Sequence, residues 1–249
     1  MAAHTGKVIW VTGASGALGG AIARHLATEG ATVIASSRSV RAEDFVESAG
    51  IRLLALDVKN TSAVQAAADH IVSTYGRLDG VVVSTNVGAF GDFLELSDDA
   101  WYAVLEAKLL GSVRVVRAAL PVLIKQGKGA VVVISGRGGI DPPPQHFPGS
   151  SVNAALDLLV QGLGRRYGRH GVRTNAIAPG PIRSPRYQAL EDAEPGDGKG
   201  KNQYASVALG APGEPLDVAH AASYLLSDAA AFVNGSTLAL DGGGPGYQL

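Results

Sequence analysis

Short runs of β-branched residues alternate along the chain with longer segments in which apolar residues recur at helical spacing. The runs at residues 81–83 and 131–134 contain no alternating polar residues, which is typical of strands that are buried on both faces of a parallel sheet. The pattern predicts seven strands, at residues 8–11, 32–35, 52–56, 81–83, 130–134, 173–177 and 237–240. It predicts six helices, at residues 18–28, 42–48, 62–75, 98–125, 152–167 and 215–226.

This alternation predicts an α/β fold, a doubly wound Rossmann fold with one seven-stranded parallel sheet and helices on both faces. No linker, charge block or repeat divides the chain, so residues 1–249 are expected to form a single domain. Three prolines stiffen the connection at residues 141–144. The polar, glycine- and lysine-rich segment 191–203 is either a mobile flap over a cleft or a disordered surface excursion.

Composition narrows the possible partners. The 249 residues include 21 basic and 22 acidic side chains, for a net charge of −1, which argues against a nucleic-acid binder. No apolar run approaches the roughly 20 residues that span a bilayer, and residues 1–7 lack the features of a signal peptide. We therefore expect no membrane partner and a cytoplasmic location. There are no cysteines and no paired histidine spacing, so no metal site is expected.

The first strand runs into a glycine-rich turn at residues 12–19, and a helix follows. Backbone N–H groups at such a helix N-terminus bind phosphate, and glycines allow the ligand to approach the backbone closely. The turn is therefore expected to bind a dinucleotide, although a merely structural turn remains the alternative. The expected binding residues in the turn are Gly13, Ser15, Gly16, Ala17, Leu18 and Gly19.

The turn resembles the Thr-Gly-x-x-x-Gly-x-Gly motif of the short-chain dehydrogenase/reductase family, with Ala17 in place of the middle glycine. Residues 175–182 (Asn-Ala-Ile-Ala-Pro-Gly-Pro-Ile) and 241–243 (Asp-Gly-Gly) are similar to further family segments, so the resemblance covers nearly the whole chain. It implies an NAD(P)-binding domain. It also implies that cofactor contacts come from Asp57 and Val58 at the adenine, from Ser84, Thr85 and Asn86 in place of an Asn-Asn-Ala-Gly motif, and from Pro179, Gly180 and Ile182 around the nicotinamide.

The end of the second predicted strand helps to choose the cofactor. Its sequence, Ser36-Ser37-Arg38-Ser39, has no carboxylate that would accept hydrogen bonds from ribose hydroxyls and repel a 2′-phosphate. Arg38 can instead form charge-assisted hydrogen bonds to such a phosphate. This favours NADP(H) over NAD(H), and the alternative is an ordinary solvated arginine.

The family resemblance also identifies positions for catalysis. In this family a tyrosine supplies a proton, a lysine four residues later lowers its pKa, a serine orients the substrate oxygen, and an asparagine on the preceding long helix completes a proton relay. Residues 149–156 align with the family's tyrosine–lysine helix, and Ile134-Ser135-Gly136 aligns with its serine pair. In this chain the tyrosine, lysine, serine and asparagine positions hold Gly149, Asn153, Gly136 and Lys108.

Some neighbouring side chains are candidates to replace the missing ones. Lys108 and Asn153 look like an exchanged pair that keeps one positive charge near the nicotinamide ribose, unless Lys108 simply extends into solvent. His146, three residues before Gly149, is a possible substitute acid because histidine titrates near neutral pH. The alternative is an ordinary loop histidine. Tyr187 either points into the cleft or lines the flap.

Two interpretations therefore remain open. In the first, the chain is a pseudoenzyme that binds NADP(H) and acts as a structural or regulatory subunit, in a homo-oligomer (dimer or tetramer) or in a hetero-oligomer with an active relative. The interface would use helices 98–125 and 152–167, where Leu156, Leu159, Val160 and Leu163 suit a buried seam or face the chain's own sheet. In the second, a site rebuilt around Lys108 or His146 catalyses an NADP(H)-dependent or redox-neutral reaction, and two glycines make room for a bulky small-molecule ligand.

Overall fold

The computed structural model describes residues 2–45, 49–185, 188 and 207–244. Seven parallel strands form one sheet in the order β3-β2-β1-β4-β5-β6-β7. This confirms the single-domain Rossmann fold predicted from the sequence. The strands are β1 (Val8–Thr12), β2 (Thr32–Ser37), β3 (Ile51–Ala55), β4 (Gly80–Val83), β5 (Gly129–Ile134), β6 (Val172–Pro179) and β7 (Thr237–Leu240).

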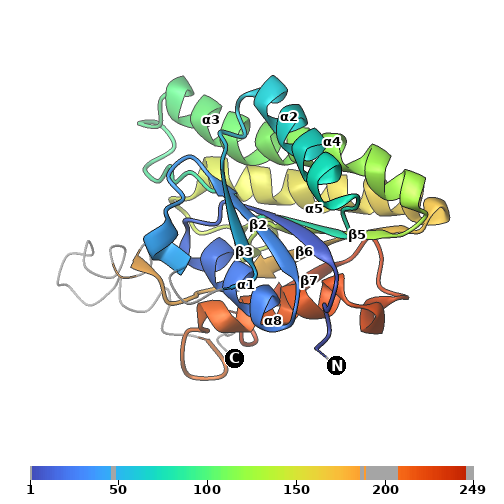
Figure 1. Cartoon of the computed structure of the whole chain (residues 1–249). Helices are drawn as coiled ribbons and strands as arrows, with labels where there is room; N and C mark the ends of the chain where they lie inside the picture. The colour runs from blue at the N-terminus through green and yellow to red at the C-terminus, as the bar shows by residue number, and fades with distance from the viewer. Residues whose placement is uncertain (1, 46–48, 186–187, 189–206, 245–249) are drawn as a thin grey trace.

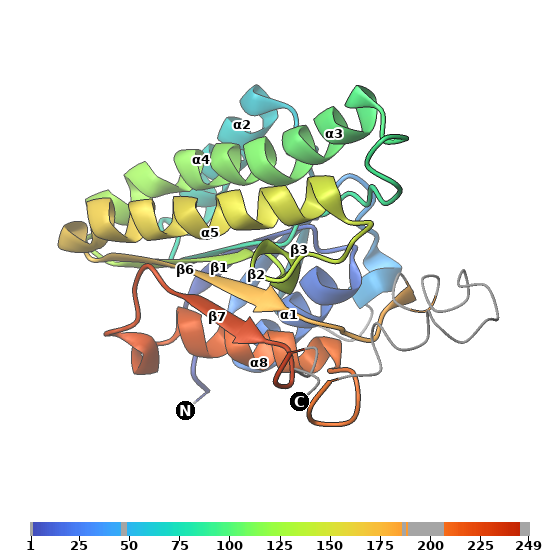
Figure 2. The ribbon, with the colours of Figure 1, turned by 180° about the vertical axis from the view of Figure 1, so that it is seen from behind.

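Helices cover both faces of the sheet. Figures 1 and 2 show α1 (Ala17–Thr28) and α8 (Pro215–Leu226) below the sheet, and α2 (Thr61–Tyr75), α4 (Gly111–Gln126) and α5 (Phe147–Tyr167) above it. The described residues also form the helix α3 (Asp98–Val104) and the shorter segments η1 (Ala42–Phe45), η2 (Leu105–Leu110), η3 (Arg137–Gly139), η4 (Gly168–His170) and η5 (Asp228–Ala230).

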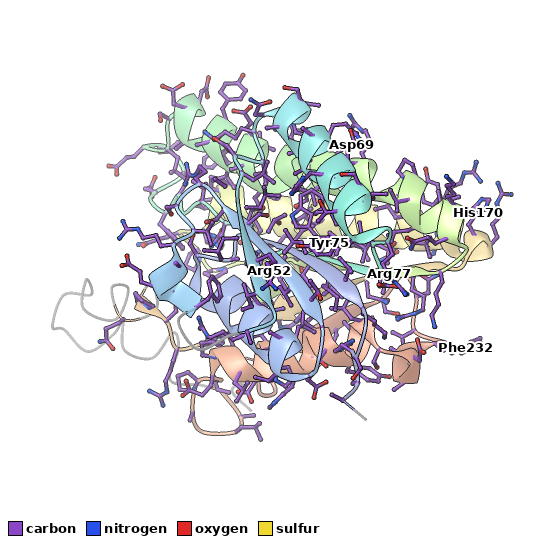
Figure 3. The ribbon with its side chains drawn as sticks, in the orientation of Figure 1. Arg52, Asp69, Tyr75, Arg77, His170 and Phe232 are labelled. Carbon is purple, nitrogen blue, oxygen red and sulfur yellow. The ribbon has the colours of Figure 1, made fainter. Side chains whose placement is uncertain are left out.

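Two apolar clusters hold the layers together, one on each face of the sheet. Trp10 and Leu156 belong to the cluster under α2, α4 and α5, and Ile22 and Leu225 belong to the cluster under α1 and α8. All residues of β1, β4 and β5 are buried, as the unbroken apolar runs predict. Figure 3 shows side chains filling the space between sheet and helices, whereas the fully exposed Phe232 lies at the edge of the molecule.

The interface candidates on α5 divide between core and periphery. Leu156 and Val160 are completely buried in the chain's own core, and Leu159 and Leu163 pack partly against it. This favours the alternative in which these leucines and the valine face the chain's own sheet. In contrast, Leu158 on the same helix has an exposed fraction of 68%.

Three predicted elements differ from the observed ones. The helix expected over residues 42–48 is a single 3₁₀ turn, η1, and residues 46–48 lie outside the described part. The helix α5 begins at Phe147 rather than at residue 152 because Pro148 occupies its first turn, where its fixed backbone angle favours helix initiation. The long helix over residues 98–125 is interrupted by the π-helical segment η2.

Candidate functional site

A cavity of about 590 Å³ opens where β1, β4, β5 and β6 end at their carboxyl termini. Its position matches the usual ligand site of doubly wound sheets, where the strand order reverses between β1 and β4. The volume falls in the range of small-molecule sites. The cavity is lined by the glycine turn and by the loops that follow the four strands.

The glycine turn packs closely against neighbouring backbone, and its residues from Ser15 to Gly19 line the cavity. Gly13 has a φ of +72°, and a Cβ there would overlap the carbonyl oxygen of Ser84. A Cβ at Gly19 would overlap the carbonyl oxygen of Gly13. Gly16, the N-cap of α1, supplies no side-chain cap to the helix, so the N–H groups of its first turn remain available for an anion. These residues fit the diphosphate of a dinucleotide.

The candidate cofactor residues fall into two groups. Gly13 is not among the lining residues, and Arg38 is exposed just past β2 and makes no hydrogen bond or ion pair within the described residues. Asp57 and Val58 follow β3 and do not line the cavity, although Asp57 accepts a hydrogen bond from the Lys59 backbone at 3.0 Å. The other candidates all line the cavity, namely Ser15, Gly16, Ala17, Leu18, Gly19, Ser84, Thr85, Asn86, Pro179, Gly180 and Ile182.

Lys108 and Asn153 form a direct contact in the cavity wall. The Lys108 Nζ donates to the side-chain oxygen of Asn153 at 2.5 Å and to the Ser135 carbonyl oxygen at 3.0 Å. Lys108 is only 5% exposed, so the alternative in which it extends into solvent is wrong. It lies in η2, and the wider π-helical turn is a feature often found at functional sites.

Asp157, which the sequence analysis did not select, lies one helical turn beyond Asn153 on α5. Burial raises the pKa of its carboxyl group, and the nearby Ser135 and Thr237 hydroxyls and the Lys108 charge oppose that shift only in part. Its Oδ1 atom is buried without a well-directed hydrogen bond in the described residues. The spacing of four residues from Asn153 was the available signal, because such residues share a helix face.

Gly136 and Gly149 leave space that other side chains fill. A Cβ at Gly136 would lie 2.7 Å from the Asn153 amide nitrogen, and a Cβ at Gly149 would overlap the His146 imidazole at Nε2. The imidazole stacks on Phe90, with ring centroids 4.5 Å apart, and its Nδ1 lies 3.4 Å from the Ser150 hydroxyl. The structure therefore brings His146 to the place where a side chain at position 149 would begin.

Sequence reasoning also missed Phe90 and Arg137, which line the same cavity. The Arg137 Nε lies 2.7 Å from Oδ2 of Asp241 in an ion pair between the loop after β5 and the turn after β7. The sequence analysis noted Asp241 only as part of a motif. The available signal for Arg137 was that it directly follows Gly136. Tyr187 and segment 191–203 lie outside the described residues.

Comparison with known proteins places the chain in a family. Residues 13–244 match the family model described as enoyl-(acyl carrier protein) reductase. An uncharacterized oxidoreductase of Mycobacterium tuberculosis is 34% identical over 244 residues, which cover 95% of this chain and 90% of the relative. The chain belongs to the short-chain dehydrogenase/reductase family. Members of this family use a nicotinamide dinucleotide, and the glycine turn of this short-chain dehydrogenase/reductase fits that group.

Two further comparisons agree with this membership. A D-threitol dehydrogenase of Mycolicibacterium smegmatis is 31% identical to this short-chain dehydrogenase/reductase over 244 residues, covering 96% of the chain and 92% of the relative. The solved structure of a short-chain type dehydrogenase/reductase from Mycobacterium ulcerans superposes with a TM-score of 0.91 at 28% identity, covering 97% of this chain and 90% of that one. The shared activity class is oxidoreductase.

Metal-ligand clusters and membrane-spanning helices are both absent from the described part of the chain. Its histidine, aspartate and glutamate side chains form no group of three or more that would hold a metal ion. None of its helices is both long enough and apolar enough to cross a membrane.

Proposed function

We propose that this short-chain dehydrogenase/reductase binds NADP(H) but is catalytically impaired, and that it acts as a structural or regulatory subunit. The observation that carries the proposal is the pair Gly136 and Gly149. At these two positions, where relatives are expected to carry the serine and tyrosine hydroxyls, the neighbouring space is filled by the Asn153 amide and the His146 imidazole. A positioned acid or base typically contributes 10²–10⁴-fold to the rate, so its loss removes most carbonyl reduction.

Nearby hydroxyl groups are already engaged. The Ser135 hydroxyl donates to the Ile177 carbonyl oxygen at 3.2 Å, and the Ser150 hydroxyl lies against His146. Lys108, the buried cation of the wall, donates to Ser135 and Asn153. These contacts support a role for the wall in holding a nucleotide and not in transferring a proton to a substrate.

The cofactor preference rests on Arg38. The residue is exposed at the end of β2, and the segment 36–39 holds no carboxylate that would repel a 2′-phosphate. When the nucleotide is bound, Ser84, Thr85 and Asn86 would face it from β4 and Pro179, Gly180 and Ile182 from β6, while Asp57 and Val58 lie further along the edge of the sheet. The nicotinamide ring would supply hydride chemistry.

Replacing Arg38 should separate the two nucleotides. We expect Arg38→Ala to weaken NADPH binding about tenfold or more, because a charge-assisted hydrogen bond is lost, and to leave NADH binding nearly unchanged. NADPH and NADH fluorescence titrations measure both. Arg41→Ala is the matched control, since Arg41 is a nearby exposed arginine that pairs with Glu43 at 3.0 Å. Equal losses for NADPH and NADH on Arg38→Ala would remove the 2′-phosphate argument.

Association with a second subunit is part of the proposal. Exposed apolar side chains on α3, η2 and α5 support it, since Tyr102, Leu110 and Leu158 have exposed fractions of 67%, 44% and 68%. Figure 2 shows α4 and α5 side by side on one face of the molecule. The partner would be a second copy, in a dimer or tetramer, or an active relative in a hetero-oligomer. The cytoplasmic location stays a prediction.

A second candidate function is an active oxidoreductase or redox-neutral enzyme with a rebuilt site. The observation that favours it is the His146 imidazole at the beginning of the missing tyrosine side chain, fixed by the Phe90 stack. This candidate predicts turnover in a panel of carbonyl and alcohol substrates assayed with NADPH and NADP⁺. It also predicts that His146→Ala reduces the rate about 10²-fold or more. An unchanged rate in that variant would eliminate His146 as the acid.

A further inference from the structure

Arg137 is a charged side chain in the cavity wall that neither candidate function uses. It opens η3 directly after Gly136 and lines the cavity. Its Nε is fully buried, while the side chain as a whole keeps an exposed fraction of 25%. The guanidinium is therefore anchored at its base and still accessible to a ligand.

Asp241 provides that anchor. Its carboxylate lies 2.7 Å from the Arg137 Nε, and its side chain is only 11% exposed. A guanidinium has five N–H donors, and in the part of the chain that the structure describes the two terminal nitrogens of Arg137 are accessible and have no hydrogen-bond partner. Asp241 thus holds one edge of the guanidinium in place and leaves the other donors for a ligand.

Arg137 is better placed to bind an anionic ligand than the other charged side chains around the cavity. Lys108 is buried and donates to Ser135 and Asn153. Asp141, the carboxylate among the lining residues, is exposed, so water and salt screen it. Arginine presents parallel N–H donors that match the two oxygens of a carboxylate.

The other residues of the cavity wall indicate the chemistry of the rest of the ligand. Apolar side chains line it together with polar ones, and the apolar ones include Ile134, Ile182 and Val207. Phe90 with its stacked His146 ring presents a flat surface. Gly136 lines this wall without a side chain of its own, and the Asn153 amide lies 2.7 Å from where its Cβ would be. We infer that the cavity binds a small carboxylic acid with an apolar body, and that Arg137 holds the carboxylate. This inference rests on the proposed function, because the acid would lie beside the bound nucleotide.

The test compares a carboxylate with its matched neutral amide. The probes are 4-phenylbutyrate and 4-phenylbutyramide, titrated calorimetrically into the full-length protein with and without saturating NADP⁺. We expect the carboxylate to bind about tenfold or more tightly than the amide, as one charge-assisted hydrogen-bonded pair provides. We expect Arg137→Gln/Asp241→Asn to abolish that preference while NADPH affinity stays the same. The double variant removes both charges, so it leaves no unpaired carboxylate in the wall.

A matched ion pair outside the cavity serves as the control. Arg183 and Glu214 are also joined at 2.7 Å, and both are more than half exposed. Arg183→Gln/Glu214→Gln should keep the preference for the carboxylate. Equal binding of the two probes to the unmodified protein would overturn the inference, as would a preference that survives in the Arg137 double variant. Failure of NADPH to bind the unmodified protein would instead overturn the proposed function, which separates the two ideas.

Discussion

NADPH-dependent carbonyl reduction should appear when the family's four catalytic side chains are introduced together with a smaller side chain at position 146. The expected variant carries Gly136→Ser, Gly149→Tyr, Asn153→Lys, Lys108→Asn and His146→Ala. The first four changes place the serine, tyrosine, lysine and asparagine at the positions that the family resemblance assigns. We expect a gain of about 10²-fold or more over the unmodified protein, because a positioned proton donor alone contributes that much.

The fifth change follows from the structure. A Cβ at position 149 would overlap Nε2 of His146, so a tyrosine there requires the imidazole to leave. Because His146 also stacks on Phe90, moving it costs that aromatic contact, which is worth about 0.5–1.5 kcal/mol. A Cβ at position 136 would crowd Asn153 at 2.7 Å, but that residue is replaced in the same variant.

The measurement is the loss of NADPH absorbance with a panel of small ketones and aldehydes. The matched control carries the four family substitutions and keeps His146. We expect it to be clearly slower than the variant with all five substitutions. Equal rates in the two would show that His146 does not obstruct the tyrosine. If the variant with five substitutions folds, binds NADPH and still fails to reduce any carbonyl, the missing side chains are not what limits carbonyl reduction by this protein.

Much of the fold was predictable because its signals are local. Strand β5 is buried along its whole length and reads as an unbroken apolar run, and a glycine turn between a strand and a helix has few structural alternatives. The position of Arg38 past β2 was predictable for the same reason. These features depend on neighbours within a few residues, which a single sequence records.

The candidate site was predictable only where the alignment with the family's motifs linked distant positions. The Lys108–Asn153 contact joins residues 45 apart in the sequence, and the alignment placed them together. That alignment did not indicate that His146 fills the space at Gly149 or that Arg137 pairs with Asp241. It also did not indicate that η2 departs from α-helical geometry. Those features depend on side-chain orientations in loops and on packing between elements that meet only in the folded protein.

The Lys108 environment also shows why one substitution at this site drives others. A buried ammonium requires hydrogen-bond acceptors and a nearby negative charge. The Asn153 oxygen and the Ser135 carbonyl supply the acceptors, and Asp157 supplies the charge. An asparagine at position 153 therefore goes together with a lysine at position 108, since a second lysine there would bring two positive charges into contact.

Gly19→Ala should disrupt the nucleotide turn, although alanine is the better helix former. A Cβ at Gly19 would overlap the Gly13 carbonyl oxygen and lie 2.8 Å from its carbonyl carbon. Both are backbone atoms of the turn, so no side-chain rotation relieves the contact. We expect the free energy of unfolding to fall by about 1–3 kcal/mol, as for overpacked sites, and NADPH affinity to fall as the N–H groups of the turn move.

A second helical glycine isolates the cause. A Cβ at Gly162 in α5 would meet no heavy atom within 4 Å, so Gly162→Ala should gain about 1 kcal/mol from helix propensity alone and leave NADPH binding unchanged. Denaturant unfolding without nucleotide and NADPH fluorescence titration compare the two variants. The substitution is the same and both sites are helical, so opposite signs of the stability change would trace the effect to the Gly13 carbonyl. If Gly19→Ala instead resembled Gly162→Ala in both measurements, the turn would not need to be this tight, and its assignment as the diphosphate site would lose its main physical support.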